Sequence, residues 1–509
     1  MTPLHERIAA QDPERLAGIR RGIEKEGLRV LPTGGLALTP HPLALGSALT
    51  HPHITTDYSE SQIELITGAH LGVEEALGEL TEVHQYVLRT LQGAGGEMLW
   101  VSSMPCGLPT DETIPLARYG ASNVGRAKSI YRMGLGHRYG RRMQTISGIH
   151  YNWSLPGVSS AQYFGLIRNF RRYGWLLLYL FGASPALCQS FVAGREHGLQ
   201  RLSDSTFYLP HATSLRMGPL GYQSDAQASI AVSYNCLESY ADSLQAALSR
   251  PYPAYEAIGI QTPGGDYSQL STSLLQIENE FYSTIRAKRV IRPGERPLHA
   301  LRERGVEYIE VRLMDLDPFE PVGISADTMR VLDAFLLHCL QADSPPDTPE
   351  EIAANGRNQH RVAARGREPG LSLELPGGGE RLLVDWAAEL LRACEAHADA
   401  LDAAHGGSAY RDALARVGER LARPELTPSA RVLAAMAQQH GNSHIGFIAQ
   451  RSGETHAALL ALPYPQALRE RFEQLAAASV EEQRRIEAAD TLPFEEFRRF
   501  YVAPERMAV

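Results

Sequence analysis

GIEKEGLRV, residues 22–30, places two glutamates at alternating positions within an apolar frame near the start of the chain. Side chains in a β-strand point alternately to its two faces. Glu24 and Glu26 would therefore share one face of a strand, while Ile23 and Lys25 take the other. On a solvated face such a pair has no special role, but in a cleft with further carboxylates nearby it becomes a metal site.

Three further segments divide in the same way into an apolar face and a polar face. DYSESQIELIT (57–67), SGIHYNWSL (147–155) and GVEYIEVRL (305–313) each have the pattern of a strand. If these strands are neighbours, one sheet face collects polar side chains from all of them, and Asp57 joins from a loop. The polar faces hold Glu24 and Glu26, then Gln62 and Glu64, then His150, Asn152 and Ser154, and finally Tyr308, Glu310 and Arg312.

A cluster of this kind predicts divalent cations. Carboxylates that converge without compensation repel one another by roughly 1 to 4 kcal/mol per close pair. Oxygen ligands suit Mg²⁺ or Mn²⁺, and a single imidazole is compatible with Mn²⁺, whereas zinc would favour more Cys and His.

Each strand taken alone has a simpler interpretation. Alternating acids are often a solvated strand face, and a single histidine such as His150 is often a hydrogen-bonded core residue. Arg312 could form an ordinary ion pair with Glu310, which contributes little when exposed. The metal-site hypothesis therefore depends on the joint pattern and on an adjacency of strands that the sequence leaves open.

The composition is that of a globular protein. The 509 residues are 44% hydrophobic and 21% charged, with a net charge of -9 and a pI of about 6.1. This length is compatible with one large domain that carries smaller additions, or with two to three domains. The acidic balance argues against broad nucleic-acid binding.

Cysteine usage and hydropathy indicate the compartment. The cysteines are odd in number and contain no CxxC motif, so we expect reduced thiols, with neither a disulfide framework nor a zinc site. The first residues lack the apolar stretch of a signal peptide. The longest notable apolar run, WLLLYLFGA (175–183), is too short to span a bilayer. These features predict a cytoplasmic protein without membrane attachment. The cysteines are Cys106, Cys188, Cys236, Cys339 and Cys394.

The order of elements predicts an α+β fold. Up to about residue 325, strand and helix patterns are mixed, whereas beyond it Ala, Leu, Arg and Glu recur at helical spacing. No long spacer rich in Gly, Ser or Pro separates the two parts. We therefore predict an α+β core over residues 1–325 and a mostly helical region over 326–509 that packs on it. The individual expectations are a turn at 32–35 with a return strand at 36–38, helices at 74–93 and 160–180, and strands at 144–155 and 305–316.

Two glycine-containing segments fail as phosphate-binding motifs. GASNVGRAKS (120–129) has the glycine spacing of a phosphate loop, but Arg126 stands where that loop needs lysine. GLGHRYG (134–140) does not fit the dinucleotide fingerprint. The basic residues around them, and those of IRAKRVIRPGER, could bind an anionic ligand such as the phosphates of ATP, with a solvated basic surface as the alternative.

Several segments together resemble the proteobacterial family of glutamate–cysteine ligases, which catalyse the first step of glutathione synthesis. They follow one another from about residue 20 to 325, with weaker likeness beyond, in RVAARGREPGLSL and EAADTLPF. The resemblance implies a glutamine-synthetase-like fold, in which a curved antiparallel sheet forms a funnel, helices back it and the active site lies on the concave face. The segments are RGIEKEGLRV, ALGSALTHPHITTDYSESQIELIT, LWVSSMPC, ARYGASNVGRAKSIYRMGLGHRYGRRMQTISGIHYNWSLP, YLFGASPA, YLPHATSLRMGPLGY, LLQIENEFYSTIRAKR and GVEYIEVRLMDLDPF.

The resemblance also implies a reaction. ATP would phosphorylate the γ-carboxylate of L-glutamate, and the amino group of L-cysteine would displace phosphate to give γ-glutamylcysteine, without a covalent enzyme nucleophile. Two alternatives stay open: a related ligase that takes another small amine, such as 2-aminobutyrate, and a non-catalytic regulatory homologue. The substrates would be small molecules only, and we expect a monomer, with a homo-oligomer as the open alternative.

Site residues follow from the resemblance position by position. Arg216 and Arg312 would bind the substrate carboxylate or the transferred phosphoryl group, because a guanidinium binds such groups bidentately. Tyr58 stands where the family pattern leads us to expect phenylalanine, which would loosen discrimination between amines. The implied ligands of Mg²⁺ (or Mn²⁺) are Glu24, Glu26, Asp57, Glu64, His150 and Glu310. The pocket for the amine substrate would comprise Tyr58, Tyr131, Leu135, Gln144, Tyr222 and Tyr282, and the nucleotide contacts Lys288, Arg289 and Arg132.

Overall fold

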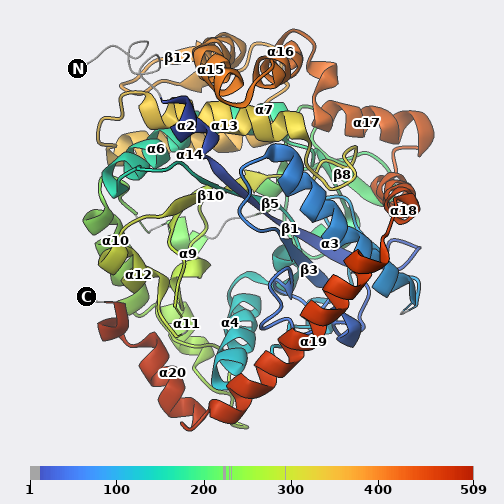
Figure 1. Ribbon diagram of the computed structural model, residues 1–509, viewed down its shortest axis with the longest axis vertical. Coiled ribbons are helices and arrows are strands. Elements are labelled where there is room, and N and C mark those ends of the chain that lie inside the picture. Colours follow the sequence, from blue (N-terminus) through green and yellow to red (C-terminus); the bar gives the residue numbers. More distant parts are fainter. Residues whose placement is uncertain are drawn as a thin grey trace.

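The computed structural model describes residues 12–507 apart from 94, 222–224, 229, 231 and 293. At its centre is an antiparallel sheet with the strand order β2-β3-β1-β5-β10-β9, and β4 pairs with the end of β1 (Figure 1). The four strands that the sequence predicts to carry polar faces are therefore neighbours. The bounds are β1 Arg20–Val30, β2 Ile54–Thr56, β3 Gln62–Ile66, β4 Met98–Leu99, β5 Ile149–Ser154, β9 Ile285–Lys288 and β10 Tyr308–Met314.

The apolar faces of these strands form one side of the main core. Helices α3 (Val73–Gly93), α6 (Ser160–Tyr173), α7 (Trp175–Phe181) and α13 (Ala326–Gln341) lie against the sheet or against one another on this side. The other sheet face is left for the polar side chains. The strand residues in this core are Ile23, Ile63, Leu65, Ile149, Tyr151, Trp153, Ile309 and Val311.

The carboxy-terminal third adds further helices outside this layer. Helices α15 (Leu383–His405) and α16 (Ala409–Ala422) pack on α13, and α14 (Pro349–Arg365) packs on α7. The α+β class is thereby confirmed. The remaining elements are α2 Pro13–Ala17, α4 Asn123–Tyr139, α5 Arg141–Gln144, β6 Ala186–Cys188, α8 Gln189–Val192, β7 Gln200–Arg201, β8 Thr206–Tyr208, α9 Asp225–Ala228, α10 Leu237–Ser249, α11 Pro253–Ile258, α12 Pro297–Arg304, β11 Ser372–Glu374, β12 Glu380–Leu382, α17 Pro428–Gln439, α18 His444–Ala461, α19 Gln466–Ala489 and α20 Phe494–Val502.

A buried polar network joins the sheet to these outer helices. The guanidinium of Arg21, on β1, donates to Asp333 of α13 at 2.6 Å and to the hydroxyl of Tyr410 of α16 at 3.0 Å. Tyr151, on β5, donates its hydroxyl to the same Asp333 at 2.8 Å. A buried charge is costly unless it is paired and hydrogen-bonded, so this network fixes the register between sheet and helices.

Three expectations about local structure are corrected. The turn at 32–35 is present, but the return strand at 36–38 is reduced to one bridge between Leu36 and Val30. The chain then turns so that Thr39 accepts a hydrogen bond from Arg29 at 2.7 Å. The strand expected from 144 starts only at Ile149, because the preceding residues 141–144 form α5, and the helix expected at 160–180 is divided at Gly174 into α6 and α7.

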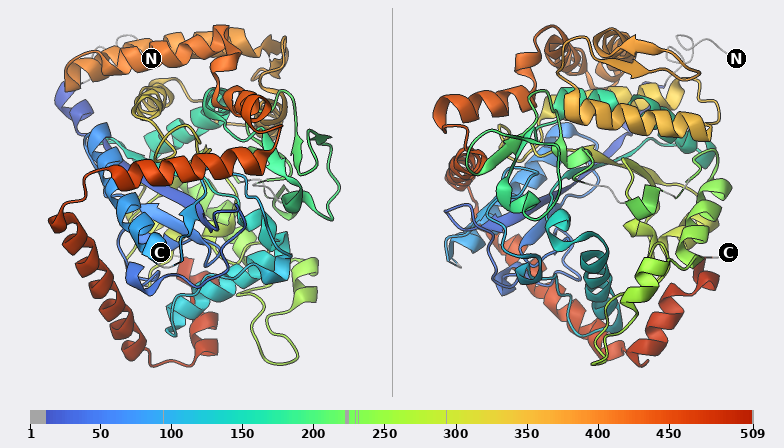
Figure 2. Two further views of the ribbon diagram at one scale, coloured as in Figure 1. Left: turned by 90° about the vertical axis from the view of Figure 1, so that its right-hand side faces the viewer. Right: turned by 180° about the vertical axis from the view of Figure 1, so that it is seen from behind.

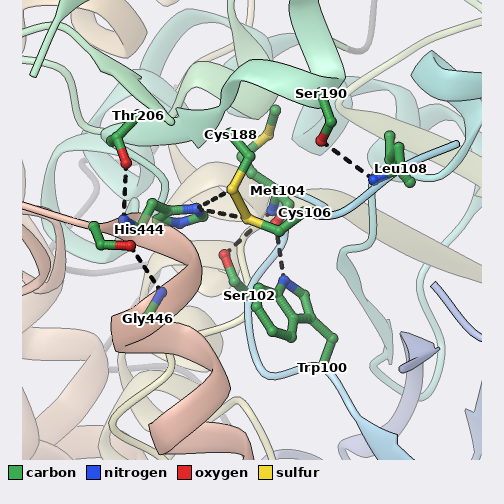
Figure 3. Close-up of a disulfide and its surroundings, with 11 residues drawn as sticks. Trp100, Ser102, Met104, Cys106, Leu108, Cys188, Ser190, Thr206, His444 and Gly446 are labelled. Carbon is green, nitrogen blue, oxygen red and sulfur yellow. Dashed lines mark hydrogen bonds between the residues drawn. A yellow bond between two sulfur atoms is a disulfide. The ribbon is translucent and has the colours of Figure 1, made fainter. Parts of the chain in front are cut away.

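The expectation of reduced thiols is wrong for one pair of cysteines. Cys106 and Cys188 form a disulfide that joins the loop after β4 to the end of β6 (Figure 3). His444, at the start of α18, places Nδ1 3.2 Å from the Sγ of Cys106. The two cysteines are separated by 82 residues and belong to no spacing motif, so the sequence carried no signal for the pair. Cys236, Cys339 and Cys394 are free.

Helices α19 and α20 run along the outside of the molecule. Figures 1 and 2 show α19 extending from the side of α3 to the beginning of α4, and α20 continuing towards α12. Among the described residues, every helix is too short or too polar to cross a lipid bilayer.

Candidate active site

A cavity of about 200 Å³ opens on the polar face of the sheet. It lies between the strands, helix α4 and the segment that precedes β9. Most of the residues that we predict as site residues meet there. Those are Glu24, Glu26, Asp57, Tyr58, Glu64, Tyr131, Arg132, Leu135, Gln144, His150, Tyr282, Lys288, Glu310 and Arg312, and they are joined by Ile146, Asn279 and Arg286.

Strand register brings the acidic residues together. Glu24 lies opposite His150 across the β1–β5 pair, and Glu26 lies opposite Glu64 across the β1–β3 pair. Glu310, on β10, faces Asn152 of β5. The alternation predicted for the opening stretch is thereby confirmed.

Lys25 occupies the opposite face of β1, as predicted. Its Nζ lies 2.6 Å from Nε2 of His84 on α3. Burial lowers the pKa of Lys25 to about 7. The lysine therefore belongs to the packing behind the sheet rather than to the cavity.

Glu24, His150 and Glu310 form the tightest part of the cluster. One ligand atom from each lies within 4.8 Å of the other two. Nδ1 of His150 is 3.2 Å from Oε2 of Glu24 and 3.9 Å from Oε1 of Glu310. Glu24 is also held by Nδ2 of Asn152, which donates to its Oε1 at 2.8 Å.

His150 has the properties of a metal ligand. Burial, together with the Arg312 guanidinium, lowers the pKa of His150, so its ring is neutral. With the ring proton on Nδ1, which faces Glu24, the lone pair of Nε2 faces Oε1 of Glu26 at 3.6 Å. Nε2 is buried and makes no hydrogen bond to any described residue. A buried acceptor without a hydrogen bond is costly, and a cation bound at Nε2 would satisfy it.

The carboxylates divide into two electrostatic groups. Burial, reinforced by Asp57, raises the pKa of Glu26 to about 8. Burial and the neighbouring Glu24 raise the pKa of Glu64 well above its usual range. Burial acts in the same direction on Glu310, but Lys288 and Arg312 outweigh it and hold the pKa of Glu310 well below its usual range. Arg216 and Arg312 act on Glu26, and Arg132 acts on Glu64, but this positive charge does not outweigh burial and the neighbouring acids as it does at Glu310.

Three basic side chains surround Glu310. Nζ of Lys288 lies 3.0 Å from Oε1, and Nη1 of Arg312 lies 3.0 Å from Oε2. Nη1 of Arg286 is 4.0 Å from the same Oε2. Arg289 follows Lys288 in the chain but does not line the cavity, because its guanidinium donates to the carbonyl of Arg304 instead.

Arg216 lies directly beneath this group without lining the cavity. Its Nη2 donates to the carbonyl oxygen of Arg312 at 2.8 Å, and its Nη1 is 3.8 Å from Oδ1 of Asp315. Asp315 is fixed in turn by hydroxyl groups from Ser184, at 2.6 Å, and Ser214, at 3.0 Å. Arg216 therefore lies behind Arg312 rather than at the cavity surface.

An aromatic wall closes the cavity on the side of α4. Nε2 of Gln144 donates to the hydroxyl of Tyr282 at 2.8 Å, and the Tyr282 ring packs edge-on against Tyr139 at 5.6 Å. The Tyr58 hydroxyl is buried, and a Cβ added to Gly136 would lie 2.5 Å from it. The oxygen that distinguishes Tyr58 from phenylalanine is thus accommodated against α4. Tyr222 lies outside the described residues.

Comparison with known proteins assigns the chain to a family. The family model for glutamate-cysteine ligase matches residues 6–362. The curated glutamate–cysteine ligase of Alcanivorax borkumensis is 47% identical over 516 residues, which cover 97% of each protein.

The chain belongs to the glutamate–cysteine ligase family.

Further relatives agree with this membership. The glutamate–cysteine ligase of Azotobacter vinelandii is 50% identical over 503 residues, which cover 95% of this chain and 94% of that protein. A crystal structure of glutamate–cysteine ligase from Francisella tularensis in complex with AMP matches with a TM-score of 0.91 at 37% identity. That match covers 96% of this chain and 99% of the other.

Three cavity residues were not predicted as site residues. Arg286 belongs to the run IRAKRVIRPGER, whose basic residues we expect only in general terms to bind an anion. It precedes Lys288 by two positions on β9 and therefore shares its face. The alternation rule could have selected it. Asn279 and Ile146 come from segments outside the observed strands.

Proposed function

We propose that this chain is an ATP-dependent glutamate–cysteine ligase, which acts in the cytoplasm and makes γ-glutamylcysteine for glutathione synthesis. The observation that carries the proposal is the convergence of Glu24, Glu26, Glu64, His150 and Glu310 on one sheet face. The chain's membership of the glutamate–cysteine ligase family supports the same activity.

The proposed metal ligands are Glu24, Glu26, Asp57, Glu64, His150 and Glu310. They fit Mg²⁺, with Mn²⁺ as an alternative, because the donor set is rich in oxygen and contains one neutral imidazole. The bound cations would neutralise negative charge on the phosphate oxygens of ATP.

The basic residues would bind and orient the acidic groups. The Arg312 guanidinium lies at the cavity wall and can form two parallel hydrogen bonds to a carboxylate or a phosphoryl group. Arg216 would support it from behind, and Lys288 and Arg132 would contact nucleotide phosphates. Arg289 would have to release the carbonyl of Arg304 to contact the nucleotide, because its guanidinium is bound away from the cavity.

The aromatic wall would bind the side chain of the amine substrate. Tyr58, Tyr131, Leu135 and Tyr282 provide a small apolar surface beside the polar cluster, and Tyr222 is proposed to complete it. A thiol is weakly polar and polarisable, so it suits such a surface. The amine held there would attack the γ-glutamyl phosphate, a C–N bond would form, and phosphate would leave with the bonding electrons of the C–O bond.

The proposal is tested by product analysis. We expect purified protein with Mg²⁺, ATP and L-glutamate to release ADP and form γ-glutamylcysteine in equal amounts when L-cysteine is added. A higher kcat/KM for 2-aminobutyrate would instead support a ligase for another small amine. If no amine elicits glutamate-dependent ADP release, the catalytic proposal is wrong and a regulatory homologue is favoured.

A further inference from the structure

The carboxy-terminal helices α19 and α20 contact the helix that forms one wall of the cavity. We define the C-terminal strap as residues 466–502, which comprise α19, α20 and the segment between them (Figure 1). Oε1 of Glu487, near the end of α19, accepts a hydrogen bond from the amide of Ala121 at 2.8 Å. Oδ2 of Asp490 accepts one from the amide of Asn123, the first residue of α4.

Asp490 adds to the cap of α4, and Glu487 binds the amide of Ala121, the residue that precedes the N-cap Ser122. The first amides of a helix have no partner within the helix, and the helix dipole favours negative charge at that end. The local cap of α4 is Ser122, whose hydroxyl accepts from the amide of Gly125 at 3.2 Å. Asp490 and Glu487 supply the further acceptors from a segment more than 350 residues away in sequence. The hydrogen bond from Ala121 also lowers the pKa of Glu487.

The backbone at Gly120 is shaped for this contact. Gly120 has a φ of +82°, and an added Cβ would lie 2.1 Å from Nε2 of Gln483 and 2.3 Å from Oε1 of Glu487. The strap therefore packs directly on the backbone that leads into α4. Two more contacts follow along the helix. Nδ2 of Asn123 donates to the carbonyl of Leu492 at 2.9 Å, and the Arg126 guanidinium lies 4.1 Å from the centre of the Phe494 ring.

The capped helix carries cavity residues on its next turns. Tyr131, Arg132 and Leu135 all line the cavity. Nε of Arg132 donates to the backbone carbonyl of Asp57. The side chain of this same residue supplies the loop carboxylate of the proposed metal site. The position of α4 along its axis therefore sets the distance between this wall and the carboxylate cluster.

The strap also holds the opposite wall. Nη1 of Arg498 donates to the carbonyl of Leu270 at 2.6 Å. Arg296, just before α12, donates to the carbonyl of Tyr501. The same Arg296 pairs with Glu278, which adjoins the cavity residue Asn279. Residues of α20 thus fix the segment that leads into β9, where Arg286 and Lys288 lie.

We infer that Glu487 and Asp490 are positioning residues of the active site. Asp490 caps α4 and Glu487 holds the backbone just before it, so that together they keep Tyr131, Arg132 and Leu135 against the carboxylate cluster. The catalytic consequence rests on the function proposed above. The effect of Glu487 and Asp490 on the position of α4 does not rest on that function, because it concerns the protein without substrates.

The test combines hydrogen exchange with kinetics on the full chain. Asp490→Ala combined with Glu487→Ala should speed amide exchange over residues 123–135 by roughly fivefold, the factor expected for loss of a good cap. The KM for glutamate or ATP should rise by roughly three- to tenfold, more than kcat falls, because the wall carrying Arg132 is displaced. Asp490→Asn, which keeps an acceptor oxygen, should restore most of both values.

Glu482→Gln is the matched control. Glu482 lies on the same helix but pairs with Arg485 on the surface, so both readouts should stay at the wild-type values. Unchanged exchange over 123–135 in the double variant would overturn the capping role. Faster exchange with unchanged KM would overturn the positioning role. If the wild-type protein makes no γ-glutamylcysteine, the proposed function fails, while exchange at 131–135 still decides whether the strap positions that wall.

Discussion

Gly148, the residue before β5, connects two parts of the candidate site. Its amide donates to Oε2 of Glu26 at 2.7 Å, and the Arg216 guanidinium occupies the space where a side chain would lie. In a Gly148→Ala variant the new Cβ would be 2.0 Å from Nη2 of Arg216. An ordinary contact is about 3.4 Å, so the guanidinium would have to move by about 1.4 Å.

Arg216 cannot move by this distance without losing its packing and its hydrogen bond to Arg312. It is only 1% exposed, and its Nη2 donates to the carbonyl of Arg312. We expect the free energy of unfolding to fall by about 1–3 kcal/mol, as is typical of overpacking. We expect kcat/KM to fall by about 10²-fold, the loss that a displacement of roughly 1 Å can produce.

The assay compares Gly148→Ala with a glycine that has free space around it. Apart from its chain neighbours and the backbone of its own helix, no atom lies within 4 Å of a Cβ added to Gly453, in the middle of α18, so Gly453→Ala should leave kcat/KM unchanged. Both variants are measured by initial rates of ADP release and by urea unfolding. Wild-type kcat/KM in Gly148→Ala would refute the reasoning, as would an equal loss in Gly453→Ala.

Three further predictions concern the cavity itself. Glu64→Gln should lower kcat by orders of magnitude while the thermal unfolding midpoint stays within a few degrees. If the variant stays active at limiting Mg²⁺, Glu64 is not a metal ligand. Arg312→Lys should raise the KM for glutamate or lower kcat, because lysine cannot form two parallel hydrogen bonds; unaltered kinetics would leave Arg312 as a simple ion-pair partner of Glu310. Burial and Asp57 raise the pKa of Glu26 to about 8, so this carboxyl holds a proton at pH 7. Binding of Mg²⁺ should release that proton, and the affinity for Mg²⁺ should therefore increase as pH rises towards 8. Calorimetry at pH 7 in two buffers with different ionisation enthalpies measures the released proton, and identical binding enthalpies would contradict this assignment.

Strand periodicity predicted the faces of the site well. Glu24 and Glu26 share one face and Lys25 the other because the side-chain period of a strand is two residues, whatever the rest of the fold does. The same rule places Lys288 in the cavity and Arg289 outside it, although both were named as nucleotide contacts from the family resemblance.

The local rules do not predict which segments distant in sequence lie side by side. β5 lies beside β10, more than 150 residues later, and only the family resemblance indicated that such strands share a sheet. The Cys106–Cys188 disulfide was missed for the same reason, since no local spacing marks a partner 82 residues away. The contacts of Asp490 and Glu487 with α4 are likewise tertiary, and the exposed acids of a helix end look alike in sequence.

The buried network around Arg21 has a consequence for synthesis of the chain. Its carboxylate partner Asp333 is 312 residues downstream, and the hydroxyl of Tyr410 is 389 residues downstream. At roughly 5–20 residues per second, a ribosome takes about 20–80 s to cover that distance. During this interval the guanidinium of Arg21 has the carbonyls of Ile19 and Leu71 as partners but lacks the carboxylate that balances its charge. The nascent amino-terminal half should therefore remain open, and accessible to chaperones and proteases, until α13 and α16 have emerged.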